Sequence, residues 1–514
     1  MTISFTEALG GPVPGTEIEI NLQGLGGFPS GDQIRNILVL SERVAAGTST
    51  GNAVTSTPFG SADDASTWFG AGSPGAHQCA YIFDYRNSES GKPKCAVYGA
   101  AVAVAGGTAA IQTLTLAVNA TASGVWEFMI GGFPVSIAVS TGDTPVVQAT
   151  ALVAAWNALA EKDSVPLTAA NGAGVNPAVT FTANTAGAHY NNIGLETITD
   201  PGIGTTDTWS GTTMGAVGGT PGVGLAPVLT TVIANLASFQ GAGQIVIPWG
   251  EDGTAAAKSF EVAAVEGLID HINTQGNATN MEPTSLVVAW KNTAALLAAA
   301  KGVAPFASDD DQRVHFVAHP YSAVSGAGAW EGELAAQTAA LRATETHYAR
   351  SFDGLKYRNL QQPLSADNWT SAELKTLIEA GCCPIWQPAI AADMVLVRDV
   401  ISRTSFGVVD GTIMDSLDYV RASVAAKLAT LSRMSIVDDD EDPPPVEHIT
   451  QPGSIKALIR TVFNDLETKG YVTNVADNWD NVVVELSGTT VALSIPTDIV
   501  PQLHNIMVRL DSSV

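Results

Sequence analysis

The hydrophobic pattern changes along the chain and divides it into segments with different expected folds. In residues 25–102 and 216–405, short continuous apolar runs alternate with amphipathic stretches, as at Ile34–Leu40 and Thr254–Thr274. Short apolar runs between helical patterns indicate the buried strands of a mostly parallel sheet. The two segments are therefore expected to build one α/β core that is discontinuous in sequence.

Further elements of this core follow from the same pattern. Additional strands are expected at Gln244–Trp249, Leu286–Trp290, Val314–Ala318, Cys383–Gln387 and Met394–Arg398. Additional helices are expected at Ala65–Tyr85, Ala226–Ser238, Thr293–Lys301, Trp330–Glu345 and Ser371–Ala380. Because strands and helices alternate, the connections are those of a parallel sheet with helices on its faces.

Residues 103–215 have a different period. Apolar and polar residues alternate in several runs, for example around Trp126 and Ile137, and a period of two is typical of half-buried strands. Gly131–Gly132 separates two of these runs, and such a link favours a hairpin because glycine accepts positive φ. One helix is expected at Thr144–Lys162. The segment is predicted to be an inserted β-rich domain on the outer surface of the core.

Residues 406–495 are predicted to form a C-terminal α+β domain. Its expected elements are helices at Ser416–Met434 and Ser454–Lys469 and strands at Val482–Leu486 and Val491–Ile495. An acidic run followed by prolines at 438–445 is expected to be a solvated loop. The whole chain is thus expected to be an α+β multidomain protein with a discontinuous α/β core and an inserted β-rich domain.

Both ends of the chain, residues 1–24 and 496–514, are predicted to be arms. Apolar residues alternate in Thr16–Leu22 and again at Ile506 and Val508, which gives these ends strand character. Exposed strand edges are normally hidden or used for pairing, so the arms are expected to exchange strands with neighbouring subunits. The residues predicted for intersubunit strand exchange are Glu17, Ile18, Glu19, Ile20, Asn21, Leu22, Val482, Val483, Val484, Val491, Leu493, His504, Ile506, Val508 and Leu510.

Composition and charge limit the possible partners. The 514 residues carry 50 acidic and 24 basic side chains, a formal net charge of −26. Direct binding to nucleic acid needs clustered Lys and Arg and is therefore disfavoured. Only 14% of residues are charged, against about 25% in ordinary soluble domains, which suits a surface covered by copies of the same chain. A plain soluble protein with an alanine-rich core explains the composition equally well.

The lack of a recognisable targeting signal and the small number of cysteines favour a cytoplasmic protein. Met1–Glu7 has no basic start and no apolar segment of signal-peptide length. Apolar runs such as Ala96–Gly106 are short and interrupted, so membrane insertion is not expected. Four cysteines are too few for a disulfide scaffold and are expected to be reduced and buried. They are Cys79, Cys95, Cys382 and Cys383.

No catalytic, cofactor-binding or metal site is predicted. The chain has no GxxxxGK[ST] phosphate loop, and the glycines within 215–224 are expected to be a hinge. Ala71–Gly75 is close to a nucleophile elbow but lacks its first glycine. The acidic runs Asp309–Asp311 and Asp438–Asp442 lack the spacing of a calcium loop, so both are expected to be solvated.

Two pairs of potential metal or redox residues were weighed against structural roles. His315 and His319 are four apart on an expected strand, about 13 Å along the chain, which is too far to share one zinc ion. They are expected to be a packed histidine and a loop histidine. The adjacent Cys382 and Cys383 are expected to be two thiols beside a buried strand, because adjacent cysteines rarely bridge.

Several short sequence pieces occur in the same order as in a known family. By these pieces the chain resembles the contractile-tail sheath proteins of Mu-like bacteriophages and related contractile injection systems. The resemblance extends over essentially the whole chain and includes both arms. The pieces are Val13–Gly15, Trp68–Ser73, Gly131–Gly132, Asp143–Thr144, Val246–Trp249, Met394–Arg398, Asp418–Arg421 and Arg509–Leu510.

The resemblance implies a mechanical function without catalysis or cofactor. Copies would stack as homohexameric rings around a tail tube, in a virion tail assembled in the host cytoplasm, and would contact baseplate and tail terminator proteins. Contraction would drive the tube through the host envelope. Two alternatives stay open: an α/β enzyme with an accessory β-domain, and another virion structural protein. The enzyme would need convergent polar groups at strand ends, and the sequence pattern reveals no such set.

Overall fold

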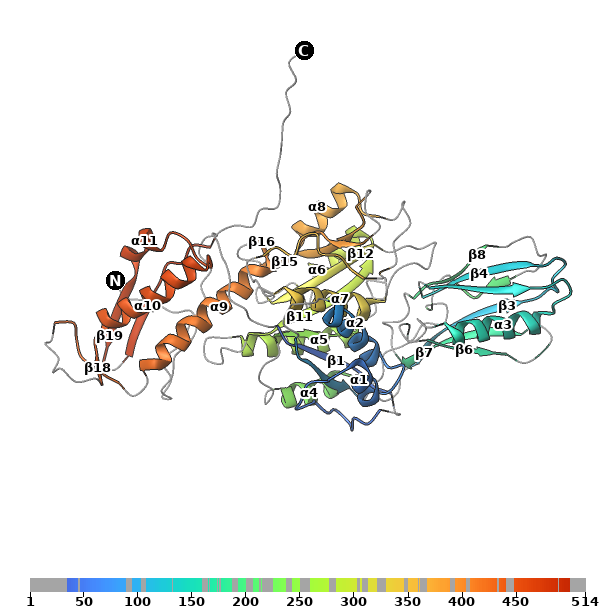
Figure 1. Cartoon of the computed structure of the whole chain (residues 1–514), viewed down its shortest axis with the longest axis horizontal. Coiled ribbons are helices and arrows are strands. Elements are labelled where there is room, and N and C mark those ends of the chain that lie inside the picture. Colours follow the sequence, from blue (N-terminus) through green and yellow to red (C-terminus); the bar gives the residue numbers. More distant parts are fainter. Residues whose placement is uncertain are drawn as a thin grey trace, which may run out of the picture.

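The structure is a computed structural model, in which three bodies lie in a row (Figure 1). The α/β core is in the middle, with the inserted β-rich domain on one side and the C-terminal domain on the other. The structure describes residues 35–44, 47–88, 95–102, 108–131, 133–159, 165, 167–172, 174, 177–186, 193–199, 207–211, 214, 225–236, 243–249, 259–276, 283–302, 306, 313–320, 330–345, 350–358, 360, 368–388, 393–403, 407–431, 434–440, 448–488 and 490–499.

The core is built on a seven-stranded sheet in the order β14-β13-β12-β11-β10-β1-β2. Its strands are β1 (Ile37–Glu42), β2 (Val97–Val102), β10 (Gln244–Val246), β11 (Ser285–Asn292), β12 (Val314–Pro320), β13 (Cys382–Trp386) and β14 (Val395–Leu396). All neighbours pair in parallel except β13 and β14. Ile37 of β1 lies opposite Gln244 of β10, so segments on either side of the insertion share one sheet, as the sequence predicted.

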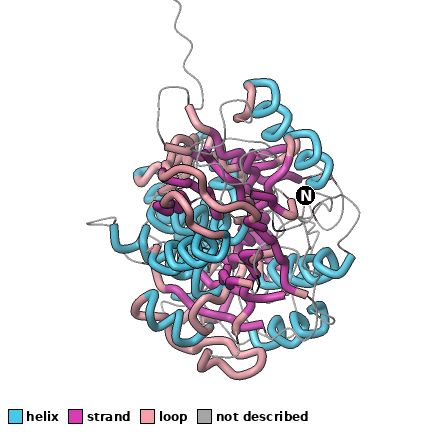
Figure 2. The backbone as a smooth tube through the Cα atoms, turned by 90° about the vertical axis from the view of Figure 1, so that its right-hand side faces the viewer, coloured by secondary structure: helices cyan, strands magenta, loops and turns pink. Residues whose placement is uncertain are grey.

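Helices cover both faces of this sheet, and Figure 2 shows strands in the middle with helices on either side. Ile37 and Val39 face one apolar layer, whereas Leu38 and Leu40 face the other, as strand alternation requires. The first layer contains α1 (Ala62–Phe69), α2 (Pro74–Ser88) and α7 (Glu331–Thr344); the second contains α4 (Leu225–Leu236), α5 (Ser259–Gln275), α6 (Ala294–Lys301) and α8 (Ser371–Glu379). Across the described ranges, no helix combines the length and apolarity that crossing a membrane requires.

Within the described residues, the inserted segment forms two antiparallel sheets and one helix around an apolar cluster that also includes Trp330 of the core. Its elements are β3 (Ala109–Leu116), β4 (Gly124–Ile130), β5 (Phe133–Val139), α3 (Pro145–Ala158), β6 (Leu167–Asn171), β7 (Ala178–Ala186), β8 (Leu195–Thr199) and β9 (Asp207–Trp209). Trp126, Trp156 and Phe181 are at most 1% exposed. Ile130 pairs with Phe133 and Gly131 has φ 56°, which confirms the predicted two-residue hairpin.

The C-terminal part begins with a two-stranded ribbon and continues into a helical domain with a second hairpin. Its elements are β15 (Val400–Arg403), β16 (Gly407–Asp410), α9 (Gly411–Leu428), β17 (Ser435–Ile436), β18 (Ile449–Thr450), α10 (Pro452–Thr468), α11 (Val475–Asn478), β19 (Val483–Ser487) and β20 (Thr490–Ser494). Two 3₁₀ turns lie at Ala429–Leu431 and Trp479–Asn481.

Several predicted elements differ from the observed ones. The strand expected at Gln244–Trp249 is only Gln244–Val246. The single helix expected at Ala65–Tyr85 is two helices, because Gly70 and Gly72 between them have φ 91° and 75°, a region that ends helices. The strand expected at Met394–Arg398 is only Val395–Leu396. The helix expected to begin at Ser416 begins at Gly411, five residues earlier.

All four cysteines are free and buried, as predicted. Burial raises the pKa of Cys95 to about 11 and that of Cys382 to about 12. These thiols therefore stay protonated near neutral pH and are poor nucleophiles.

Candidate functional site

The hairpin β19–β20 contains the part of the predicted strand-exchange site that lies in the described residues. Val484 pairs with Leu493, and Val483 pairs with Ser494. Val484, Val491 and Leu493 are half-buried and pack on the apolar cluster of the C-terminal domain, and Val482 lies inside that cluster at 4% exposed. The two strands are therefore formed close to the predicted positions, with Val482 just before β19, whereas their intersubunit role stays a prediction.

Both outer backbone edges of this hairpin lack a strand partner within the described residues, since the sheet has only two strands. An isolated hairpin is marginally stable in water, and an unpaired strand edge can accept an added strand. The remaining predicted residues, in the arm segments Glu17–Leu22 and His504–Leu510, lie outside the described part of the chain.

Helix α10 packs against the β19–β20 hairpin. Its buried residues Ile455, Ile459 and Phe463 recur at helical spacing, and they share one apolar cluster with the hairpin. Lys456 Nζ donates a hydrogen bond to the carbonyl oxygen of Val482 at 2.7 Å. This bond attaches the base of β19 to the helix.

The acidic loop before α10 has a structural role as well as solvent exposure. Asp438, Asp439 and Asp440 are exposed, as predicted, whereas residues 441–445 of the predicted solvated loop lie outside the described part of the chain. The Asp439 carboxylate also accepts hydrogen bonds from Gly453 N at 2.9 and 3.1 Å. A carboxylate at a helix N-terminus satisfies a free N–H group and complements the helix dipole, so Asp439 caps α10.

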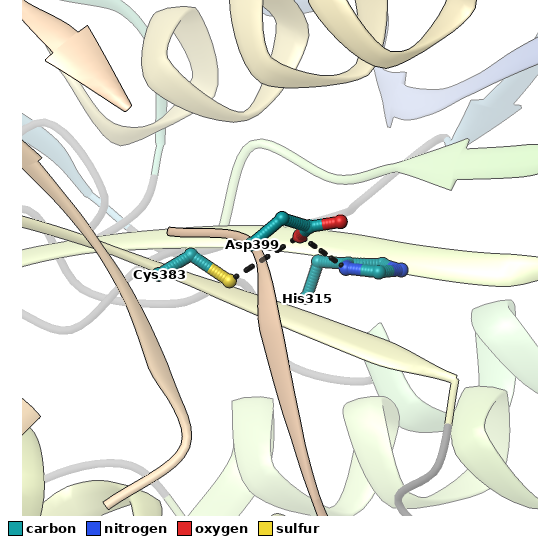
Figure 3. Close-up of side chains that lie close together, drawn as sticks. All are labelled: His315, Cys383 and Asp399. Carbon is teal, nitrogen blue, oxygen red and sulfur yellow. Dashed lines mark hydrogen bonds and ion pairs between the residues drawn. The ribbon is translucent and has the colours of Figure 1, made fainter. Parts of the chain in front are cut away.

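A buried polar cluster lies around Asp399, where β12, β13 and α7 meet the start of the C-terminal part. Figure 3 shows the His315 ring and the Cys383 sulfur directed at the Asp399 carboxylate. His315 Nδ1 lies 2.8 Å and Cys383 Sγ lies 3.6 Å from Asp399 Oδ1. Arg342 pairs with the other carboxylate oxygen. We call His315, Arg342, Cys383, Asp399 and Asp415 the Asp399 cluster.

The Asp399 cluster brings together His, Cys and Asp ligand atoms within 4.8 Å of one another, yet its chemistry does not suit a metal ion. Burial, and then the neighbouring Asp399 carboxylate, raises the pKa of the Cys383 thiol well above its usual value. Metal ligation requires the thiolate. The Arg342 guanidinium already neutralises Asp399 and would repel a cation. The set is therefore a hydrogen-bonded structural network.

A second buried cluster corrects two expectations. Lys291 at the end of β11 lies opposite His319 at the end of β12, near Glu331 and Glu333 at the start of α7. Polar groups therefore do converge at strand ends, although the sequence pattern revealed none. His319 lies in β12 and is 0% exposed, so the expectation of a loop histidine was wrong. We call Lys291, His319, Glu331 and Glu333 the Lys291 cluster.

The Lys291 cluster is closed to solvent. Its four members are between 0% and 6% exposed. Burial lowers the pKa of His319 to about 3 and raises the pKa of Glu333 to about 8. Burial likewise lowers the pKa of Lys291. At neutral pH, His319 and Glu333 are therefore uncharged, as burial in a low-dielectric interior favours.

Replacing Glu333 with glutamine is expected to flatten the pH dependence of stability. Because the pKa of Glu333 is raised from 4.5 to about 8, the folded protein binds more protons than the unfolded chain between these values. Stability from this group is present below 4.5 and falls by up to ~1.4 kcal/mol per pH unit toward pH 8. Chemical denaturation across this range should show a smaller decline for Glu333→Gln; an unchanged slope would contradict the assignment.

Comparisons with solved structures find a sheath tail protein among the chains that are similar to this one. No protein-family model matches the chain, and no curated protein matches it. The solved structure of the sheath tail protein Lin1278 from Listeria innocua is similar over 92% of this chain and 93% of its own, with a TM-score of 0.45 and 12% sequence identity. A TM-score of 0.45 at 12% identity does not establish a common fold.

Proposed function

We propose that the chain is a structural subunit of a contractile tail sheath. The observation that carries the proposal is the incomplete hairpin β19–β20 in a chain whose two ends have strand patterns. The ordered resemblance to sheath proteins supports the same reading, although membership of the Mu-like family is a prediction from the sequence alone.

In this proposal the arms of one copy add strands to the hairpin of another. The strands β19 and β20 have five residues each, and each added backbone hydrogen bond contributes about 0.5–1.5 kcal/mol net. A few such bonds per strand, repeated around a ring, give a stable assembly. Hydrogen bonds between backbones depend little on side chains, so the linkage can persist while the bodies it joins change their angle.

The assembly would consist of hexameric rings stacked around a tail tube, with contraction driven by energy stored at assembly rather than by a nucleotide. Its partners would be further copies of the chain, the tube protein, and the baseplate and terminator proteins at its ends. The inserted domain would lie on the outside. The described strands of the insertion belong to sheets of their own rather than to the central sheet, which supports this placement.

The Lys291 cluster is the one observation that favours the enzyme alternative. Catalysis requires groups that reach the substrate, whereas every member of this cluster is at most 6% exposed. We therefore rank the enzyme below the sheath.

Negative-stain electron microscopy of the purified chain tests the proposal. We expect rings or hollow sixfold tubes that grow in number with protein concentration. Because every copy carries a net charge of −26, assembly should be favoured by salt, which screens repulsion between copies. A series at low and high ionic strength beside size-exclusion chromatography measures this. A small monodisperse species under all conditions would contradict self-assembly and favour the enzyme.

A further inference from the structure

Helix α9 has two faces that contact different parts of the molecule. Ile413, Leu417 and Val420 belong to the apolar cluster of the C-terminal domain. Asp415 and Asp418 lie on another face, three residues apart, and meet arginines of the core. Figure 1 shows α9 running between the core and the C-terminal domain. The helix is therefore the physical connection between these two bodies.

Asp415 is held by two arginines that come from distant parts of the core. Its Oδ2 atom lies 2.8 Å from Arg342 Nη2 and 2.9 Å from Arg35 Nη2. The side chains of Arg342 and Arg35 are 0% and 3% exposed. Arg35 also donates to the carbonyl oxygens of Arg342 and Glu345 at 3.0 and 2.7 Å. One carboxylate of α9 thus connects the start of β1 with the end of α7.

Asp418 makes a second connection one turn further along. Both of its carboxylate oxygens accept hydrogen bonds from Arg313, just before β12. Arg421, three residues later, reaches the carbonyl oxygen of Gly276 at the end of α5 at 2.9 Å. Just before the helix, Asp410 pairs with Arg398 at 2.8 Å. Acidic groups on the α9 side therefore meet basic groups on the core side.

The start of α9 fits closely onto the Asp399 cluster. Gly411 N donates to the carbonyl oxygen of Asp399 at 3.0 Å. A Cβ atom at Gly411 would lie 2.6 Å from Asp399 Oδ2 and 2.7 Å from His315 Cε1, so only glycine allows this approach. Within the described residues, the apolar residues of α9 belong to the C-terminal cluster and to neither apolar layer of the sheet. The contact with the core is therefore mainly polar.

We propose that these ion pairs form a joint that fixes the orientation of the C-terminal domain on the α/β core. We call Arg35, Arg313, Arg342, Asp415 and Asp418 the α9 joint. Apolar surfaces can slide over each other with little cost, whereas bidentate and shared arginine–carboxylate pairs require one geometry. Opening a buried pair leaves uncompensated charges. The C-terminal domain with its hairpin is thus held in one position relative to the sheet.

The role of the joint in transmitting movement between copies rests on the proposed function. If neighbouring copies are linked through the hairpin, a displacement of the hairpin would be transmitted through α9 to the sheet without being lost in rotation between the two bodies. The orientation itself is a property of the single chain. It can be measured before any assembly takes place.

Distance measurement between two spin labels tests the joint. Cysteines introduced at the exposed positions Thr376 of α8 and Asn464 of α10 place one label on each body, and the native cysteines are buried. Double electron–electron resonance on the unassembled full chain is expected to give one narrow distance distribution. Asp418→Arg should broaden it by placing like charges at Arg313. Adding Arg313→Asp should restore the narrow distribution.

Controls separate the joint from general effects of charge. Asp393→Arg reverses an exposed charge of the core, where Asp393 pairs with Lys356, and should leave the distribution unchanged. If Asp418→Arg does not fold, the milder Asp415→Asn should broaden the distribution in its place. A narrow, unshifted distribution in a folded joint variant would overturn the proposal, as would a failure of the charge swap to restore it.

The outcome is distinguishable from failure of the proposed function. If the sheath proposal is wrong, electron microscopy will show no rings or tubes, and the label distances will be unaffected. If the joint proposal is wrong, the distances will be unchanged in the folded joint variants, whether or not the chain assembles.

Discussion

Replacing Arg342 with leucine is expected to lower the free energy of unfolding by about 3–5 kcal/mol, the usual cost of removing one partner from a buried ion pair. Arg342 is 0% exposed and neutralises both Asp399 and Asp415. Its guanidinium also lies 4.8 Å from the centre of the Phe352 ring. Leucine fills part of the volume of the Arg342 side chain, but it leaves the buried carboxylates of Asp399 and Asp415 with one fewer neighbouring cation. Urea denaturation measures the change.

The size of this loss should depend on pH in a defined direction. Burial by itself would raise the pKa of Asp399 and Asp415, but Arg342, together with His315 beside Asp399 and with Arg35 and His315 near Asp415, outweighs it and holds both pKa values below 3.8. Groups with a lowered folded pKa stabilise above their unfolded pKa and lose that contribution as pH falls through the folded value. The gap between wild type and Arg342→Leu should therefore be largest near neutrality and narrow below pH 3.8.

Arg350→Leu is the matched control. Arg350 pairs with Glu345 at 3.5 Å, but its side chain is 67% exposed. Exposed pairs contribute about 0–1 kcal/mol, so this variant should stay close to wild type. Equal losses for the two variants, or a gap that widens in acid, would show that the Asp399 cluster does not depend on Arg342.

Deleting either arm, residues 1–22 or 504–514, is expected to abolish polymerisation while leaving a folded chain. The four apolar clusters are built from residues between Ile37 and Ile499, which both deletions leave in place, so a folded chain is expected. If the arms complete the β19–β20 hairpin of neighbours, their loss removes the backbone hydrogen bonds that link copies. Electron microscopy and size-exclusion chromatography, with circular dichroism for folding, measure both effects.

A surface change on the inserted domain provides the comparison for the deletions. Val125 and Ile198 are exposed apolar residues at 53% and 43%, and replacing both with serine should leave assembly intact. Tubes formed by an arm-deleted chain would refute the strand-exchange role. Loss of tubes in the Val125 and Ile198 variant would instead place a contact between copies on the inserted domain.

Much of the fold could be predicted from the chain because its signals are local. Continuous apolar runs such as Val314–Ala318 identified buried strands, and Gly131–Gly132 identified a hairpin. The helix break at Gly70–Ser73 was missed because the sequence does not show that Gly70 and Gly72 adopt positive φ. The early start of α9 was missed because Gly411 and Thr412 are weak helix formers; tertiary contacts with Asp399 and His315 determine that boundary.

The buried clusters could not be predicted, because their members are far apart in sequence. Arg35 and Asp415 are separated by 380 positions, and only the folded sheet brings them together. A weak signal did exist: charged residues such as Lys291 and Arg313 within or beside apolar strand runs need buried partners. The sequence could indicate that partners exist, but their identity depends on the topology.

The parallel pairing of β1 with β10 also has a consequence for synthesis on the ribosome. Ile37 and its partner Gln244 are separated by 207 positions (244 − 37), so translation at about 5–20 residues per second delays the pairing by about 10–40 s. During that interval β1 and β2 have emerged without the strand that completes them. The inserted segment, whose contacts are nearer in sequence, can fold in the meantime. Until β10 emerges, the edge of the apolar strand β1 that will pair with β10 stays open. At this stage a chaperone would protect the protein most.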